Sequence, residues 1–85
     1  MARGTVRYWA AAKDAAGIAE EPFDALTLGD LVAQITRKSE NPDLVRVLER
    51  SSFLVNGHPA GTRDRHAVEL SEGATVEVLP PFAGG

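Results

Sequence analysis

The chain contains no cysteine among its 85 residues. Disulfides, thiolate metal sites, iron–sulfur ligation and a cysteine nucleophile are therefore excluded. The sequence also lacks a phosphate-binding loop of the type G-x-x-x-x-G-K-[ST]. Any step that consumes ATP by that route must then be carried out by a separate protein.

Long apolar runs and an excess of basic residues are also missing. No stretch is apolar for long enough to be a signal sequence or a membrane span, so we expect a cytoplasmic protein without a membrane partner. Nine basic residues stand against twelve acidic ones, a net charge of −3 at pH 7. Because phosphate binding needs clustered cations, we expect no nucleic-acid partner. Arg63 and Arg65, the nearest cation pair, flank Asp64 and are interpreted as a solvated loop.

Residues suited to metal binding are few. His58 and His66 are separated by a predicted loop and have no partnering cysteine, so we interpret them as exposed loop residues and predict no metal site. An acidic stretch has two interpretations: a docking surface for a basic partner or, as we favour, a solvated rim. It consists of Asp14, Glu20, Glu21 and Asp24.

The pattern of strands and helices indicates one domain, at residues 1–79, followed by a tail at residues 80–85. Apolar alternation and strand-forming residues predict strands at residues 5–10, 20–26, 52–55, 67–70 and 74–79. Helices are predicted at residues 11–16, from 28 to about 39, and from 42 onward. Strands at both ends with helix between them are typical of an α+β domain. We therefore predict a mixed sheet curled around one main helix, with the first and last strands side by side.

Local signals mark the ends of these elements. Thr27, with an acidic residue three positions later, is typical of a helix start, and Gly17 suits the end of the first helix. Pro22 favours an edge position for the second strand, because proline cannot donate a sheet hydrogen bond. Asn56 and Gly57 predict a hairpin turn.

Apolar stripes on two helices predict the core. The stripe of the main helix consists of Leu28, Leu31, Val32 and Ile35. That of the next helix consists of Leu44, Val45 and Leu48, with Val47 near its margin. On the first strand, Tyr8 and Trp9 must point to opposite sides, so we expect one in the core. The other is either an interface aromatic or a partly covered surface residue.

The most informative segment is the tail. It reads Pro80-Pro81-Phe82-Ala83-Gly84-Gly85. The two prolines end sheet pairing and favour an extended exit from the domain. Phe82, the only large apolar residue beyond the last strand, must fold back onto the domain or meet a partner. Gly84 and Gly85 lack side chains and can pass through a narrow slot close to another backbone.

The tip of this tail is the α-carboxylate of Gly85. A carboxylate is a poor acyl electrophile until one oxygen becomes a good leaving group, which adenylation by ATP would achieve. Since the chain has no phosphate-binding loop, we expect a separate activating enzyme to use the ATP. The tail, which reaches roughly 20 Å when extended, would present one unhindered carbonyl carbon to that enzyme.

Essentially the whole chain resembles the MoaD/ThiS family of sulfur carriers, and within it the small subunits of molybdopterin synthase. The shorter similarities lie at residues 6–10, 13–17, 20–21, 27–31 and 54–57. The most specific similarity is the closing strand with its tail, at residues 70–85.

This resemblance implies a β-grasp (ubiquitin-like) fold and a carrier that is not itself an enzyme. Gly85 is then the residue that is adenylated and converted to a thiocarboxylate. The implied contacts with the partner are Pro81, Phe82, Ala83 and Gly84. The implied partners are a MoaE-like large subunit of molybdopterin synthase, a MoeB/ThiF-type adenylating enzyme and a sulfur-donor protein. Catalytic side chains are expected on the large subunit, and no cofactor is expected on this chain.

Three other functions remain open at this point. The carrier could serve another route, such as thiamine (thiazole) or cysteine synthesis. The chain could be a protein modifier joined through Gly85 to lysines of other proteins. It could also be an interaction module with an inert tail.

Overall fold

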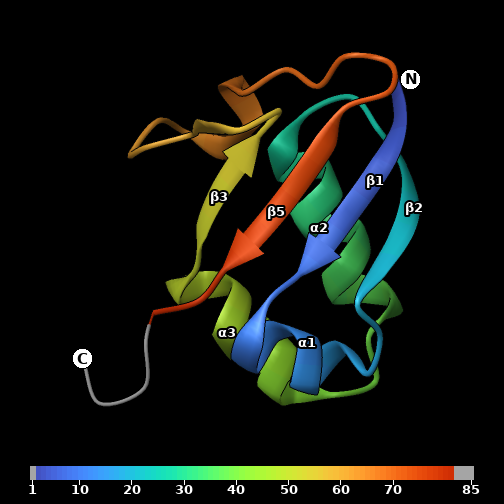
Figure 1. The fold of residues 1–85 in the computed structure, drawn as a ribbon, viewed down its shortest axis with the longest axis vertical. Helices are drawn as coiled ribbons and strands as arrows, with labels where there is room; N and C mark the ends of the chain where they lie inside the picture. The colour runs from blue at the N-terminus through green and yellow to red at the C-terminus, as the bar shows by residue number, and fades with distance from the viewer. Residues whose placement is uncertain (1, 82–85) are drawn as a thin grey trace.

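The first and last strands lie side by side at the centre of the sheet (Figure 1). The computed structural model describes residues 2–81. Strand β1 (Ala2–Tyr8) pairs in parallel with β5 (Thr75–Leu79), and the strand order is β2-β1-β5-β3-β4. The remaining strands are β2 (Glu20–Ala25), β3 (Ser52–Val55) and β4 (His58–Pro59). Their pairings are antiparallel, so the sheet is mixed, as predicted.

The helices separate the strands in sequence and cover one face and one end of the sheet. Helix α2 (Leu28–Lys38) crosses one face, whereas α1 (Ala10–Ala16) and α3 (Pro42–Arg50) lie at the end toward which β1 and β5 both point (Figure 1). A short 3₁₀ turn, η1 (Arg65–Ala67), packs against α2. The tail therefore leaves the sheet beside α1 and α3.

The core lies between the sheet and α2. Alternate residues of the central strands are fully buried because successive side chains point to opposite faces; they are Val6, Tyr8, Val76 and Val78. Helix α2 contributes the predicted stripe, with Leu28, Leu31 and Ile35 buried and Val32 partly so. Burial of these side chains is the main term that holds α2 to the sheet.

The predicted helix ends are confirmed by their caps. The hydroxyl of Thr27 accepts a hydrogen bond from the backbone N–H of Asp30 at 3.1 Å, and α2 begins at the next residue. The Asn41 side chain caps α3 in the same way, since its oxygen accepts from the N–H of Asp43 at 2.9 Å. Gly17 ends α1 with a φ of 75°, in the left-handed region that glycine adopts without strain.

The boundaries of β1 differ from the prediction at both ends. The strand begins at Ala2 rather than residue 5, because its antiparallel pairing with β2 extends to the pair formed by Ala2 and Ala25. It ends at Tyr8 rather than residue 10, because the carbonyl of Trp9 already accepts from the N–H groups of Ala12 and Lys13 in α1. The predicted edge position of β2, which contains Pro22, is confirmed.

The prediction of a strand at residues 67–70 was wrong. Residues 65–67 form η1, whose start is capped by Asp64, and only an isolated bridge between Thr27 and Glu69 follows. Backbone hydrogen bonds to the residues before α2 hold this segment in place, so its alternating pattern reflects burial of Val68 and Leu70. The loop predicted from residue 59 is also shorter, since β4 includes Pro59.

The apolar face of α3 is rotated relative to the prediction. Leu44 and Leu48 are buried as expected, but Val47 packs against the core, whereas Val45 does not belong to the core cluster. Residues three and four apart share a helix face, which places Val47 beside Leu44. This rotation brings Val47 to the junction with α1, where the tail begins.

Candidate functional site

The base of the tail is where the described chain meets the predicted site. The last ladder pair joins Ser52 to Leu79, after which Pro80 and Pro81 cannot donate a sheet hydrogen bond. Pro80 is half-buried and Pro81 is exposed. The other predicted site residues, at positions 82–85, lie outside the described residues.

Trp9 lies at the same end of the sheet, because β1 and β5 are parallel. Its backbone N–H donates to the carbonyl of Val78 at 3.3 Å, and its ring nitrogen Nε1 donates to Glu77 Oε2 at 3.0 Å. The guanidinium of Arg7 lies 5.0 Å from the ring centroid, within the range of a cation–π contact. The side chain is nevertheless 41% exposed. The prediction that one of Tyr8 and Trp9 is in the core is confirmed, and Tyr8 is that residue.

Glu21 is not part of a solvated rim, contrary to the prediction for the acidic stretch. Its side chain is only 18% exposed, accepts from the hydroxyl of Tyr8 at 2.6 Å and forms an ion pair with Lys38 at 2.6 Å. The other three acidic residues, Asp14, Glu20 and Asp24, are exposed. Glu21 therefore links β1, β2 and α2 instead of facing a partner.

Burial and hydrogen bonding shift both titrating groups of this link. Burial alone would raise the pKa of Glu21, but the hydrogen bonds from Lys38 and Tyr8 outweigh it and hold that pKa below its ordinary value. Burial, followed by the hydrogen bond to Glu21 and its negative charge, raises the pKa of Tyr8 well above its ordinary value. Glu21 stays charged and Tyr8 neutral across the physiological range, as a structural link requires.

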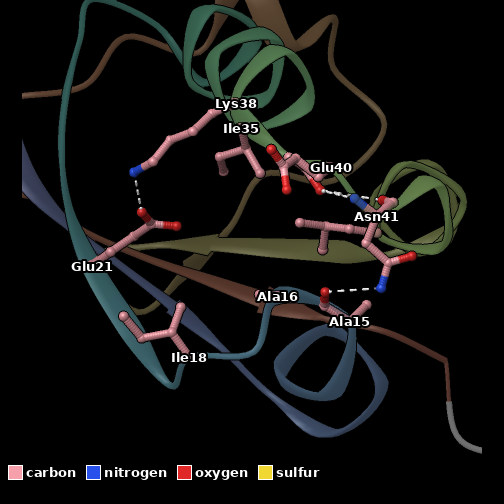
Figure 2. A pocket seen from close by; sticks show the side chains of 10 residues that line it. Ala15, Ala16, Ile18, Glu21, Ile35, Lys38, Glu40 and Asn41 are labelled. Atoms are coloured by element: carbon pink, nitrogen blue, oxygen red, sulfur yellow. Dashed lines mark hydrogen bonds and ion pairs between the residues drawn. The ribbon is translucent and has the colours of Figure 1, made fainter.

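A hollow of about 360 Å³ lies next to this link, between α1, α2 and the start of α3; its lining residues are drawn in Figure 2. Its apolar lining comes from Ala15, Ala16, Ile18, Ile35 and Leu44. Three of its polar side chains are engaged, since Glu21 pairs with Lys38 and the Asn41 amide donates to the carbonyl of Ala15 at 3.2 Å. We interpret it as a packing junction between elements.

A second hollow, of about 230 Å³, lies at the base of the tail. Its lining consists of Ala11, Arg46, Val47, Arg50, Pro80 and Pro81. This hollow could not be predicted from the sequence, because its walls come from α1, α3 and the segment after β5. The available signal was the spacing of Arg46 and Arg50, which places both arginines on one face of a helix.

The two histidines lie apart from the base of the tail. His58 is exposed in β4 and His66 lies in η1, so neither is in the plain loop that was predicted. The His66 ring stands over Gly29, and its Nδ1 lies 3.8 Å from Asp30 Oδ1. Within residues 2–81, no group of three or more histidine or acidic side chains is placed to hold a metal ion. No helix in that part of the chain is both long and apolar enough to cross a membrane.

Comparison with known proteins decides the family. The model of the ThiS family matches residues 6–85, from β1 through the tail. The chain belongs to the ThiS family. The resemblance to MoaD/ThiS sulfur carriers is thereby confirmed at the level of the family, and the match includes the predicted site residues. No curated protein matches the chain significantly.

Solved structures confirm the ubiquitin-like β-grasp fold for this ThiS-family chain. Small archaeal modifier protein 1 from Methanosarcina acetivorans aligns with a TM-score of 0.83 at 24% identity, covering 100% of this chain and 98% of that one. The HVO 2177 protein of Haloferax volcanii aligns with a TM-score of 0.77 at 26% identity, covering 99% and 87%. A chain from the complex of subunits 1 and 2 of molybdopterin-converting factor from Helicobacter pylori aligns with a TM-score of 0.70 at 24% identity, covering 98% and 99%.

Proposed function

We propose that this ThiS-family chain is a sulfur carrier, and that the carboxyl group of Gly85 carries the sulfur as a thiocarboxylate. The observation that supports this most directly is the extent of the family match, which continues past β5 through Gly85. Pro81, the last residue before the final four, is exposed and cannot donate a sheet hydrogen bond. A slim terminus beyond a folded domain suits entry into another enzyme's active site.

The chemistry divides between this chain and its partners. An adenylating enzyme joins a carboxylate oxygen of Gly85 to the AMP of ATP and releases pyrophosphate. A persulfide of the donor protein then attacks the carbonyl carbon, and AMP leaves with that oxygen. A thiol reductant cleaves the S–S bond of the resulting acyl disulfide, which leaves the thiocarboxylate on Gly85 and returns the donor as a thiol. This chain has no cysteine and no phosphate-binding loop, so it supplies the electrophile and its position. The MoeB/ThiF-type adenylating enzyme and the donor supply ATP binding and sulfur.

For the pathway, we propose molybdopterin synthesis, with this chain as the non-catalytic small subunit of molybdopterin synthase. The resemblance of residues 70–85 supports this assignment, as does the neighbour solved as a complex of two molybdopterin-converting factor subunits. The tail would insert into a MoaE-like large subunit, which holds the catalytic side chains. Thiazole and cysteine synthesis need the same thiocarboxylate and are distinguished only by the acceptor. The cytoplasmic location stays a prediction.

Protein modification is the second candidate function. The neighbours include small archaeal modifier protein 1, whose fold this chain shares. The same Gly85 adenylate would in that case lead to an isopeptide bond with a lysine amine. The two functions share the activation step and differ in the nucleophile that follows.

The decisive experiment is intact-mass measurement of the chain after co-expression with a MoeB/ThiF-type enzyme and a sulfur donor. A carrier gains the mass difference between one sulfur and one oxygen, and the variant lacking Gly85 gains nothing. A modifier instead appears in larger conjugates that survive reductant and boiling. If neither product appears, although the adenylating enzyme is shown to be active on another carrier, activation at Gly85 is refuted. Sulfur transfer to a pterin precursor by an added large subunit then tests the pathway.

A further inference from the structure

The hollow at the base of the tail has a size and a lining that suit the binding of one side chain. Its volume of about 230 Å³ is below the roughly 300–1,000 Å³ of small-molecule sites. Val47 and Ala11 form an apolar surface between α3 and α1, and the two prolines, Pro80 and Pro81, close one side. An apolar group on the same chain could reach this surface without crossing solvent.

Two arginines border the hollow and add a preference for an aromatic ring. Arg46 and Arg50 are one helical turn apart on α3. Arg46 is held by an ion pair with Asp43 at 2.9 Å, whereas Arg50 forms no ion pair with any residue in the range 2–81. A guanidinium of this kind stacks favourably on an aromatic face.

The same contact occurs twice elsewhere in the domain. The guanidinium of Arg65 lies 4.6 Å from the ring centroid of Phe53, and that of Arg7 lies 5.0 Å from the ring centroid of Trp9. Arg65 covers the ring of Phe53, which is buried, and Arg7 covers one face of the exposed Trp9 ring. An aromatic side chain in the hollow beside Arg50 would repeat this arrangement.

The residue that follows the wall of the hollow is aromatic. Phe82 comes directly after Pro81, so its Cα is about 3.8 Å from the Cα of a lining residue. The proline ring restricts the backbone at Pro81, which lowers the entropy lost when the next residue is placed. Phe82 is also the only large apolar residue after β5.

We propose that the hollow between α1 and α3 binds the Phe82 ring in the protein without its partners. In this docked state Arg50 covers the ring, and only Ala83, Gly84 and Gly85 project from the body. Three extended residues reach roughly 10 Å, against roughly 14 Å for the four residues from Phe82 onward. A partner that draws Phe82 out of this hollow therefore lengthens the reach of the tail by about one residue. Binding of Phe82 in this hollow does not depend on the chemistry at Gly85, but its role in presenting the tail rests on the proposed function.

Methyl NMR on the full chain tests this directly. We expect nuclear Overhauser contacts between the Phe82 ring protons and the methyl groups of Val47. Replacing Phe82 by leucine removes the ring current, so the Val47 methyl resonances should shift, while those of Val32, in α2, should not. Arg50→Ala should weaken the contact, and the matched variant Arg37→Ala, an exposed arginine on another helix, should leave it unchanged.

Three results would overturn the proposal. The first is the absence of contacts between Phe82 and Val47, together with unchanged Val47 resonances in Phe82→Leu. The second is a contact that appears only between differently labelled molecules, which would make a second copy the occupant. The third is an equal response to Arg50→Ala and Arg37→Ala. All three are measured without sulfur loading, so failure here is separate from failure of the mass experiment on Gly85.

Discussion

The hydroxyl of Tyr8, buried in β1, donates a 2.6 Å hydrogen bond to the Glu21 carboxylate on the edge strand β2. The same carboxylate accepts from Lys38 at the end of α2. One acidic side chain thus joins the central strand, the edge strand and the main helix. The arrangement also leaves the buried Tyr8 hydroxyl with a partner, which a hydroxyl in the core requires.

We expect Glu21→Gln to lower the free energy of unfolding by about 1–2 kcal/mol, because hydrogen bonds to a charged group contribute more than neutral ones. Lys38→Met is the matched control on the other side of the ion pair. Its side chain is 74% exposed, so its loss should cost less than about 1 kcal/mol. Urea unfolding of both variants measures the difference. An equal loss in the two variants would mean that the bond to Tyr8 adds nothing.

The same carboxylate should make stability depend on pH in the acid range. The pKa of Glu21 is lower in the folded than in the unfolded protein, so its stabilising contribution is fully present above the unfolded pKa of about 4.3. The contribution is lost as the pH falls through the lower, folded pKa. The stability difference between the natural chain and Glu21→Gln should therefore shrink below about pH 4. Unfolding curves from pH 7 to pH 3 measure it, and a pH-independent difference would contradict the assignment.

Two glycines should respond differently to alanine. A Cβ at Gly4 would meet the carbonyl oxygen of Ala74 and, at 2.7 Å, the ring of Phe23. The carbonyl is backbone that also accepts from Thr5, so we expect a loss of about 1–3 kcal/mol from overpacking.

Gly29→Ala is the control for that substitution. The three atoms nearest to its Cβ would all belong to the His66 ring, on a side chain that is 66% exposed and has room to rotate into solvent. Alanine also favours the helix, so the net change should be smaller than about 1 kcal/mol. Thermal unfolding of both variants decides between these expectations. A larger loss in Gly29→Ala would show that His66 is fixed in place.

If the carrier function is right, Trp9 should contribute to partner binding. Its ring lies at the tail end of the sheet and is 41% exposed. We expect Trp9→Ala to weaken binding of the adenylating enzyme at least tenfold, with a stability loss of about 1–2 kcal/mol. Leu26→Ala is the control, since Leu26 is 57% exposed and lies at the opposite end of the sheet. Calorimetric titration gives both affinities. Equal effects would exclude Trp9 from the interface.

The fold was largely predictable because its signals are local. Thr27 and Asn41 cap helices through hydrogen bonds that span two or three residues. The apolar stripe on α2 follows directly from the spacing of its apolar residues in the sequence. The strand predicted at residues 67–70 failed for the opposite reason. Its Val68 and Leu70 are buried against residues far earlier in the chain, and strand-like alternation does not distinguish such a buried connection from a paired strand.

Of the candidate site, only the tail could be predicted from the sequence, and the role of its residues stays a prediction. The properties of the prolines, Phe82 and the two glycines follow from their residue types alone. The hollow beside Pro81, in contrast, forms only where α1 contacts α3 in the folded protein. The role of Glu21 was missed for a similar reason. The nearby acidic residues Glu20 and Asp24 are exposed, and only the packing of β1 against β2 and α2 provides the two donors of Glu21.

The parallel pairing of β1 with β5, in which Thr5 lies beside Thr75, also sets the order of events during synthesis. The middle of the sheet cannot close until the ribosome has released β5, and only a few residues then separate the closed sheet from Gly85. Such distant pairing is slow to form compared with the local helices. A chain that stops before β5 therefore leaves β1 and β3 without the strand that lies between them. Any enzyme that recognises the finished sheet is in this way prevented from acting on chains that stop before β5.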